Sequence, residues 1–436
     1  MTTVVMYTLG VVLFVVGIAI SIGLHELGHL APAKKFGVKV TQYFIGFGNT
    51  VWSRRRGETE YGLKSVPLGG YVKLVGMLPP GKDEDPSRIR KSNTGMFTQI
   101  ISDARAAEYE LVEPGDEDRL FYKLPWWKKV VVMAGGPTVN LVLAFLLFGG
   151  VFMVHGVLEP TTRVDRVSDC VIAATEPDLD RACTDADPVA PAKRAGLEPG
   201  DEIVALNGVE ISSWDQLSRL IRENDNGAAT IVYLRDGEQQ TATTNTLVSP
   251  RPDLDNTEEF VEVGFLGVQP ELVREKKGPV FVVTTMGDYT WRTLQALATL
   301  PVKLWEVGKA ALGLQERDQE GPMSVVGASR VAGEMASTHE VPVTDRFFSL
   351  LMLLGAVNLF IGMLNLVPLL PLDGGHIAGA LYEALRRGVA RLLGRPDPGY
   401  FDVAKLLPVA YVMAGVILVM SVVLIYADIV APVRLG

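Results

Sequence analysis

The first 24 residues of this 436-residue chain contain no Asp, Glu, Lys, Arg or His. The apolar run that they open extends from Val4 to Ala33, which exceeds the roughly 20 residues needed to cross a bilayer. It lacks the basic leading segment and the Ala-x-Ala-like exit of a cleaved signal peptide, so we expect it to be retained as a span. Three more apolar runs bring the predicted number of spans to four: Val130–His155, Phe347–Leu372 and Leu406–Tyr426.

Lys and Arg are unevenly distributed around these spans, although the whole chain has a net charge of −9. They gather near the span ends in 34–128 and 377–405, and they are few beside the spans in 156–346, which is acidic. Basic residues near span ends mark the cytoplasmic side. We therefore predict a multi-pass protein of the inner (plasma) membrane, with both termini and residues 156–346 extracytoplasmic. The acidic outer segment gives no reason to expect a nucleic-acid partner.

Cysteine is nearly absent, because the chain has only Cys170 and Cys183, both in the predicted outer segment. An oxidising compartment permits a disulfide between them. We predict that they pair. Two free thiols are the alternative, since spacing alone does not fix the geometry of a disulfide.

Ionisable side chains return abruptly in His25-Glu26-Leu27-Gly28-His29, inside the first apolar run. On a helix, residues i and i+4 share a face, so His25 and His29 can bind one metal ion. Glu26 directly follows the first of these ligands, where its carboxylate can reach a water held by that metal. In a soluble helix the motif could arise by chance, but ionisable groups inside a span are costly and are kept mostly for function. The pattern therefore predicts a metal site.

A metal held by two histidines needs a third protein ligand, and Asp373 is the candidate. The predicted first and third spans run in the same direction and reach these residues late, so both arrive near the cytoplasmic side. Pro368 and Pro371 should interrupt the third span, and Gly374-Gly375 should loosen the chain after it. His376 is the rival ligand. We favour Asp373 because catalytic zinc accepts two histidines and a carboxylate.

Three motifs together resemble the site-2 proteases: His25-Glu-Leu-Gly-His29, Gly135-Gly-Pro-Thr-Val-Asn140, and Asn365-Leu-Val-Pro-Leu-Leu-Pro-Leu-Asp373-Gly-Gly. The resemblance covers nearly the whole chain and is strongest to the actinobacterial regulator of sigma-E proteases, which have a single PDZ domain. It implies an intramembrane metalloprotease with Zn²⁺ on His25, His29 and Asp373 and with Glu26 as the general base. It also implies that Asn365 and Asn140 hold substrate near the metal, although a buried asparagine can equally hydrogen-bond between helices.

The outer segment carries a β signature followed by a short helix. Residues 195–211 alternate in hydropathy, and Asn207-Gly208 indicates a hairpin within them. A helix is expected from Trp214 to Arg222. The segment resembles a PDZ domain, which we place at 160–268. Such a domain would bind a peptide at a sheet edge, or would exclude bulky untrimmed substrates by its size.

The inner connection is rich in strand formers from Val38 to Gly76, and Arg54-Arg55-Arg56-Gly57 lies where a turn between two strands is expected. We predict a β-hairpin region that dips towards the metal and offers Tyr71–Leu74 as an edge strand to an extended substrate. The alternative is a small cytoplasmic β subdomain without substrate contact. Residues 90–118 are polar and predict a loosely structured stretch.

The predicted fold class is a polytopic α-helical membrane protein with four transmembrane helices in the lipid bilayer, an inserted extracytoplasmic PDZ domain (α+β), and a cytoplasmic-side β-hairpin region. The expected function is cleavage of single-span transmembrane proteins, and the resemblance implies trimmed anti-sigma factors or remnant signal peptides. A zinc transporter and an inactive PDZ-containing membrane scaffold are the alternatives. The predicted domains are a first span with the zinc motif (1–37), a β-hairpin region and loop (38–128), a second span (129–156), the PDZ domain (160–268), a helical linker (269–346), a third span (347–376), a cytoplasmic loop (377–405) and a fourth span (406–428).

Overall fold

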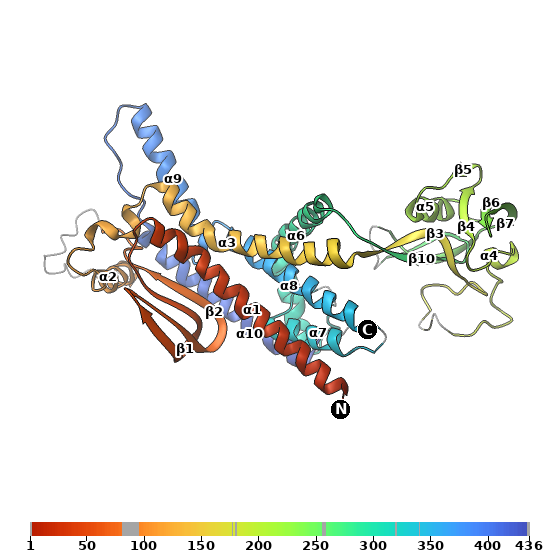
Figure 1. Cartoon of the computed structure of the whole chain (residues 1–436), viewed down its shortest axis with the longest axis horizontal. Helices are drawn as coiled ribbons and strands as arrows, with labels where there is room; N and C mark the ends of the chain where they lie inside the picture. The colour runs from red at the N-terminus through yellow and green to blue at the C-terminus, as the bar shows by residue number, and fades with distance from the viewer. Residues whose placement is uncertain are drawn as a thin grey trace. The chain divides into compact units, whose positions relative to one another are not determined.

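The computed structural model describes residues 2–80, 96–176, 178, 181–254, 259–318, 321–339 and 341–433. The chain forms two compact units. One combines Met1–Val154 with Gly278–Gly436, and the other is the intervening His155–Lys277. The first unit contains the long apolar helices, and the second is rich in strands (Figure 1). The domain expected at 160–268 lies within this second unit.

Within the described residues, four helices are long and apolar enough to cross a membrane, as predicted. At most a third of the residues in the most apolar part of each helix are buried inside the protein, as expected where lipid covers an apolar face. These helices are α1 (Thr2–Lys35), α3 (Trp126–Gly149) with its π-helical continuation η3 (Gly150–His155), α8 (Val343–Asn365), and α10 (Leu407–Val430), which follows the 3₁₀ segment η4 (Val403–Leu406).

The third span ends earlier than predicted. Hydropathy alone extends it to Leu372, whereas α8 ends at Asn365 and residues 366–372 are not helical. The physical reason is the pair Pro368 and Pro371, which a helix interior does not accommodate. Asp373 therefore does not lie on the third span. It is the first residue of the next helix, α9 (Asp373–Leu392).

Helix α9 also corrects two expectations about the residues that follow Asp373. The loop expected at 377–405 is helical as far as Leu392. Its apolar residues recur at helical spacing, which favours a helix, but the segment is too polar to be recognised as a membrane span. Gly374 and Gly375 do not loosen the chain. They lie in the first turn of α9, where a Cβ on Gly374 would come 2.1 Å from the carbonyl oxygen of Val367. These glycines let residues 366–372 pack closely onto the helix.

The predicted hairpin forms a sheet from two long strands, β1 (Val40–Arg56) and β2 (Thr59–Leu74), with the expected turn after Arg56. Both strands bend, so that Tyr43 pairs with Val72 on one side and with Tyr61 on the other. Residues 70–74 therefore form an edge, and among the described residues no strand pairs with their outer side. Strand β2 also packs against α1.

The stretch expected to be loosely structured, residues 90–118, contains a helix, although its first residues, 90–95, lie outside the described residues. The carboxylate of Glu108 accepts bonds from the backbone N–H groups of Gly76 and Met77 at 3.0 and 3.2 Å, which fixes this helix to the end of β2. The elements here are α2 (Met96–Tyr109) and the 3₁₀ segments η1 (Glu117–Arg119) and η2 (Phe121–Lys123). The linker at 269–346 contains α6 (Pro279–Ala311) and α7 (Val325–Ser337).

The second unit is built around one six-stranded antiparallel sheet of order β10-β3-β4-β6-β7, with β5 beside β4. The predicted hairpin is confirmed, because Leu206 pairs with Val209 across Asn207-Gly208. The predicted helix is confirmed as α5 (Trp214–Glu223), which buries Leu217 and Ile221 in the core of the unit. The other elements are β3 (Val157–Val167), α4 (Pro191–Arg194), β4 (Glu202–Leu206), β5 (Val209–Glu210), β6 (Ala228–Arg235), β7 (Glu238–Asn245), β10 (Val268–Glu275), and a separate pair, β8 (Leu247–Pro252) and β9 (Phe260–Phe265).

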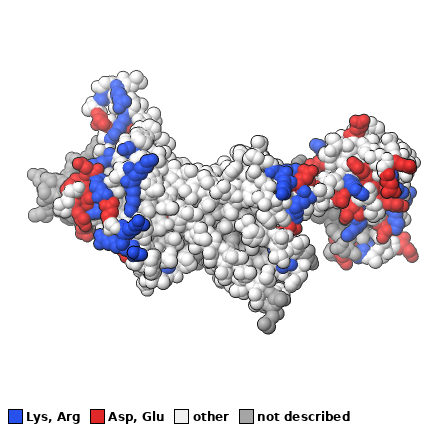
Figure 2. All heavy atoms as spheres, in the orientation of Figure 1, with Lys and Arg blue, Asp and Glu red and all other residues white. Residues whose placement is uncertain are grey.

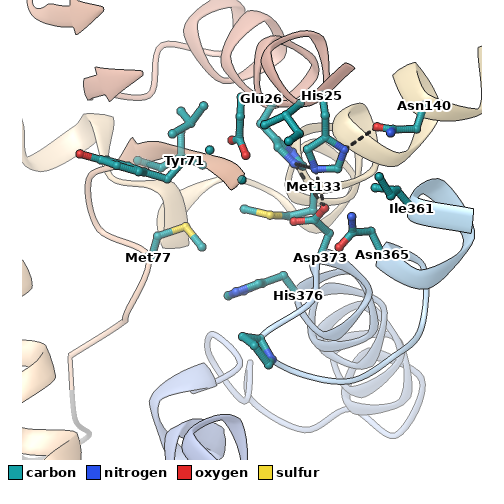
Figure 3. A pocket seen from close by; sticks show the side chains of 17 residues that line it. His25, Glu26, Tyr71, Met77, Met133, Asn140, Ile361, Asn365, Asp373 and His376 are labelled. Atoms are coloured by element: carbon teal, nitrogen blue, oxygen red, sulfur yellow. Dashed lines mark hydrogen bonds and ion pairs between the residues drawn. The ribbon is translucent and has the colours of Figure 1, made fainter. Parts of the chain in front are cut away.

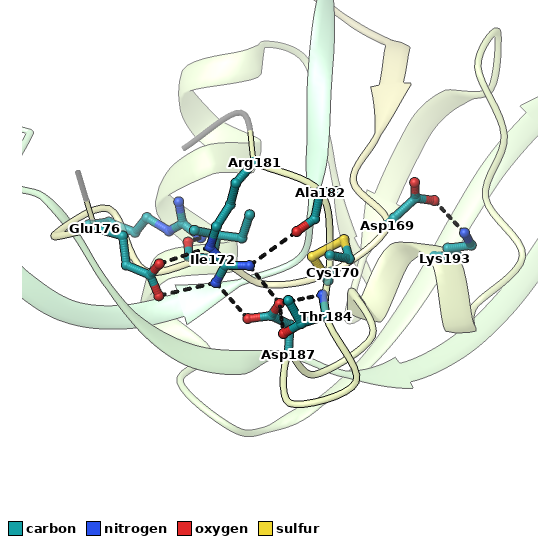
Figure 4. The surroundings of a disulfide bond; sticks show 11 residues. Asp169, Cys170, Ile172, Glu176, Arg181, Ala182, Thr184, Asp187 and Lys193 are labelled. Atoms are coloured by element: carbon teal, nitrogen blue, oxygen red, sulfur yellow. Dashed lines mark hydrogen bonds and ion pairs between the residues drawn. A yellow bond between two sulfur atoms is a disulfide. The ribbon is translucent and has the colours of Figure 1, made fainter. Parts of the chain in front are cut away.

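Cys170 and Cys183 form a disulfide in the second unit, as predicted (Figure 4). The loop that it closes is also held by Arg181, which donates to both carboxylate oxygens of Asp187 at 2.7 and 2.8 Å. The backbone N–H and the hydroxyl of Thr184 donate to the same carboxylate. The Arg181 guanidinium, assisted by Thr184, holds the pKa of Asp187 well below its usual range. A disulfide and an ion pair thus fix a loop whose residues are mostly exposed or half-buried.

Charge is distributed over the first unit as a membrane protein requires. Figure 2 shows Lys and Arg gathered around α9 and the β1–β2 sheet, beside a helical belt whose visible face is almost free of charge. A belt without charge suits the hydrocarbon core, and basic residues suit its polar border. The basic residues of these elements include Arg54, Arg55, Arg56, Arg386, Arg387 and Arg391.

Candidate metal centre

Helices α1 and α3 meet at glycines. A Cβ on Gly28 would lie 2.4 Å from the carbonyl oxygen of Gly135, and a Cβ on Gly135 would lie 2.0 Å from that of Gly28. Small residues permit such close approach between membrane helices. A Cβ on Gly136 would lie 2.3 Å from Nε2 of His29, so this glycine leaves room for the imidazoles. The Gly135-Gly136 pair thus brings α3 against the face of α1 that carries His25 and His29.

The two imidazoles are oriented by acceptors on α3. Nδ1 of His25 lies 2.7 Å from Oδ1 of Asn140, and Nδ1 of His29 lies 2.8 Å from the carbonyl oxygen of Val132 (Figure 3). A ring nitrogen that faces an acceptor carries the proton, which leaves the lone pair on the other nitrogen. The two Nε2 atoms lie 3.2 Å apart. Both rings therefore present metal-binding nitrogens to the same point.

Asp373 completes this group of donors. Its Oδ2 lies 3.4 Å from Nε2 of His25 and 3.3 Å from Nε2 of His29. Bonds of about 2.0–2.1 Å in tetrahedral geometry place ligand atoms about 3.3–3.4 Å apart, so the three separations match one face of a zinc tetrahedron. The same oxygen is buried without a conventional hydrogen-bond partner. A buried carboxylate oxygen without a donor fits a cation better than it fits an isolated ion pair.

A cavity of about 500 Å³ opens beside these donors. Glu26 lines it from α1, Gly70 and Tyr71 line it from the edge of β2, and Asn365 lines it from the end of α8 (Figure 3). A Cβ on Gly70 would lie 2.9 Å from Cγ of Glu26, so the glycine allows the sheet edge to approach this carboxylate. A peptide in the cavity would therefore meet Glu26, the three candidate metal ligands and a strand edge.

The structure distinguishes the candidate metal ligands from the other site residues that the sequence predicted. Among the described residues, one cluster of His, Cys, Asp and Glu donors has metal-binding geometry, and it consists of His25, His29 and Asp373. His376 lines the cavity but does not belong to this cluster. Asn140 contacts His25 and also donates from Nδ2 to Oδ1 of Asn358 at 3.3 Å, so it hydrogen-bonds between helices.

Three groups near the site were not identified from the sequence: the side chains of Asn358 and Ser21 and the carbonyl of Val132. Asn358 of α8 is fully buried and donates from Nδ2 to the hydroxyl of Ser21 at 3.0 Å, which ties α8 to α1 and to Asn140. An amide inside an apolar run was the signal for it, because polar groups at that depth need partners. The carbonyl of Val132 left no such signal, since every residue but proline offers the same backbone groups.

The chain is similar to known zinc metalloproteases of one peptidase family. The model of Peptidase family M50 matches residues 13–392. Zinc metalloprotease Rip1 of Mycobacterium tuberculosis is 35% identical over 451 residues, which cover 99% of each chain. Zinc metalloprotease Rip1 of Mycolicibacterium smegmatis is 32% identical over 443 residues with the same coverage, and metalloprotease MmpA of Caulobacter vibrioides is 27% identical over 394 residues and 86% of each chain.

The matched range contains both parts of the candidate metal centre, from His25 to Asp373. Site-2 proteases are the peptidases of this family, so the resemblance that the three motifs suggested is confirmed. The chain belongs to peptidase family M50.

Proposed function

We propose that this chain hydrolyses peptide bonds of single-span membrane proteins at a zinc site near the cytoplasmic surface of the membrane. The observation that carries the proposal is the group of His25, His29 and Asp373, whose donor atoms lie 3.2–3.4 Å apart in a cavity that Glu26 also lines. Family membership supports the reaction class, since the chain is a zinc metallopeptidase by its relatives.

The residues in and around the cavity have different roles in the proposed reaction. When bound, zinc supplies a Lewis acid that polarises the carbonyl of the scissile bond. The carboxylate of Glu26 accepts a proton from the attacking water and returns it to the leaving amine. Asn140 and the carbonyl of Val132 hold the imidazoles in orientation, and Asn365 is placed to contact the substrate backbone.

The free edge of β2 supports binding of an extended substrate. A peptide bond inside a helix is engaged in backbone hydrogen bonds and sterically covered, so a protease must receive its target unwound. Residues 70–74 present an unpaired strand edge among the described residues, and Gly70, Tyr71, Val72 and Leu74 line the cavity. A substrate strand added to this edge would pass Glu26.

The second unit supports a role in substrate selection. Its six-stranded sheet, its Asn207-Gly208 hairpin and helix α5 are consistent with a PDZ domain outside the cytoplasm. The basic residues around α9 and the β1–β2 sheet favour the cytoplasmic side for that end of the first unit. Substrates would be single-span proteins already trimmed outside, such as anti-sigma factors, or remnant signal peptides.

The rival functions lose support. A zinc transporter would share a His-Glu-x-x-His motif on a span, but the family is one of peptidases. An inactive scaffold would not need Glu26 beside a complete set of metal donors.

Replacing Glu26 tests the reaction. Purified Glu26→Gln should keep one zinc per chain, while cleavage of a model single-span substrate falls about 10²–10⁴-fold, as for loss of a general base. Cleavage at the wild-type rate by this variant would remove Glu26 from the mechanism. Absence of both zinc and cleavage in the wild-type chain would favour the scaffold.

Proline substitutions test the strand edge. Single prolines at Tyr71, Val72, Lys73 and Leu74 remove one backbone N–H each, and alternate positions of a strand point their N–H groups to opposite sides. The pair directed at the cavity should slow cleavage without loss of zinc, and the other pair should weaken the β1–β2 sheet. Unaltered cleavage in all four variants would sink the proposed strand addition.

A further inference from the structure

A buried ion pair joins α3 to α9 away from the metal donors. Nζ of Lys129 lies 2.8 Å from Oε2 of Glu383, and the two residues are 6% and 1% exposed. The same Oε2 accepts the backbone N–H of Phe401 at 3.0 Å. The free energy needed to desolvate two buried charges can exceed the free energy gained from their attraction. The pair is therefore weak evidence of stabilisation, and another role for it is worth considering.

Glu383 is on the helix that presents Asp373. Ten residues separate the two along α9, which is roughly 15 Å of helix. A rigid helix transmits a constraint at one position to the other. The Lys129 contact therefore limits how far α9 can slide or rotate against α3, and with it the position of the Asp373 carboxylate.

The partner helix orients the other two metal-binding residues. Lys129 lies on α3 together with Val132, whose carbonyl faces His29, and Asn140, whose amide faces His25. Gly136, which faces both imidazoles, lies between them. The spacings of three, four and four residues place these positions on one face of α3. This face of α3 thus contacts His25 and His29 directly, and it contacts α9, the helix that carries Asp373, through Lys129.

We propose that Lys129 and Glu383 are positioning residues that set the register of α9 on α3 and thereby hold Asp373 at bonding distance from the metal shared with His25 and His29. Metal sites tolerate deviations of only about 0.2 Å in ligand distance, so a small slip of α9 weakens the site. The inference rests on the proposed zinc site and adds to it residues that touch neither metal nor substrate.

The test compares zinc affinity with stability in full-length protein. Glu383→Gln leaves Lys129 as a buried charge without its carboxylate, and Lys129→Met leaves Glu383 with Arg387, whose Nη2 lies 3.3 Å from Oε1, as its remaining cation. The double variant removes both charges of the Lys129–Glu383 pair and keeps an acceptor for Phe401. Zinc affinity is measured by competition with a chromophoric chelator, and stability by thermal unfolding of the zinc-free chain. We expect all three variants to bind zinc 10- to 100-fold more weakly, in the range typical of outer-shell partners, and the double variant to regain stability without regaining affinity.

A second buried ion pair provides a matched control. Nη2 of Arg317 lies 3.1 Å from Oδ1 of Asp428, with side chains 5% and 2% exposed, and it joins α10 to the segment before α7. Neither residue lines the metal cavity. Arg317→Met and Asp428→Asn should lower the stability of the zinc-free chain while zinc affinity stays within about twofold of wild type.

Two results would overturn the inference. Return of wild-type zinc affinity in the Lys129→Met, Glu383→Gln double variant would mean that only the unpaired charge matters. An equal loss of zinc affinity in the Arg317 and Asp428 variants would mean that any buried pair acts through general stability. A wild-type chain that binds no zinc would contradict the proposed function itself. Failure of the proposed function is therefore distinguishable from failure of this inference.

Discussion

Oδ1 of Asn140 lies 2.7 Å from Nδ1 of His25, and this contact links α3 to the metal motif of α1. The amide of Asn140 reaches on to Asn358, which in turn donates to Ser21. Three apolar helices are thus joined by one chain of buried amide and hydroxyl groups. The contact favours an orienting role for Asn140 over direct binding of substrate.

Asn140→Ala should lower zinc affinity about 10- to 100-fold, because His25 loses the acceptor that fixes its ring and tautomer. Asn365→Ala is the matched control. It should raise KM for a model substrate and leave zinc affinity unchanged, since Asn365 lines the cavity without contacting the imidazoles. Equal zinc affinities of the two variants in chelator competition would assign both asparagines the same role and contradict this distinction.

Gly135→Ala should separate α1 from α3, because the added methyl group would lie 2.0 Å from a backbone oxygen that cannot rotate away. We expect a loss of about 3 kcal/mol or more, the upper end of overpacking effects, seen as a lower unfolding temperature together with loss of zinc. Gly150→Ala is the control, since nothing lies within 4 Å of its Cβ position. Similar unfolding temperatures for both variants would argue against the glycine contact.

Much of the site was predictable because its chemistry is local in the sequence. His25, Glu26 and His29 lie on one helical turn, and a costly cluster of ionisable groups in an apolar run needs no fold to be noticed. Convergence of Asp373 on them followed from counting spans and reading the charge bias. The hairpin sheet, helix α5 and the disulfide followed from local turn signals, strand and helix patterns, and the two cysteines in the predicted outer segment.

The remainder depends on packing that hydropathy does not encode. Asp373 was expected at the end of a span, whereas it opens α9, because two prolines end α8 at Asn365. Gly374 and Gly375 suggested a loose chain, yet they serve a close contact with residues 366–372. Asn358 and the carbonyl of Val132 take part through tertiary contacts with α1 and α3, which no local pattern reports.

Removing the second unit should broaden substrate choice. Its entry and exit adjoin, since Val157 pairs with Glu275, so deleting 157–276 and joining Gly156 to Lys277 spans a short gap. We expect the shortened protein to cleave untrimmed single-span substrates at a rate near that for trimmed ones, because the unit no longer excludes bulky outer domains. Retained discrimination against untrimmed substrates, measured side by side, would speak against exclusion by size.

The disulfide loop should loosen in acid. The pKa of Asp187 lies below its ordinary value because Arg181 and Thr184 donate to the carboxylate. Its contribution to stability is therefore complete above about pH 4 and is lost as the pH falls towards the lower pKa of the folded protein. Amide-exchange protection of residues 181–190 should decline as the pH falls from about 4 to about 2 in the wild type, and less steeply in Asp187→Asn. Superimposable profiles would show that this pair does not govern the loop.

The most direct test of the account is the zinc content and zinc X-ray absorption spectrum of the purified chain and two variants. We predict one zinc per chain with nitrogen and oxygen ligands at about 2.0–2.1 Å and no sulfur. Asp373→Ala should lose affinity for the metal, and His376→Ala should retain it. Full zinc binding by Asp373→Ala, or loss of zinc in His376→Ala alone, would contradict a metal centre built from His25, His29 and Asp373.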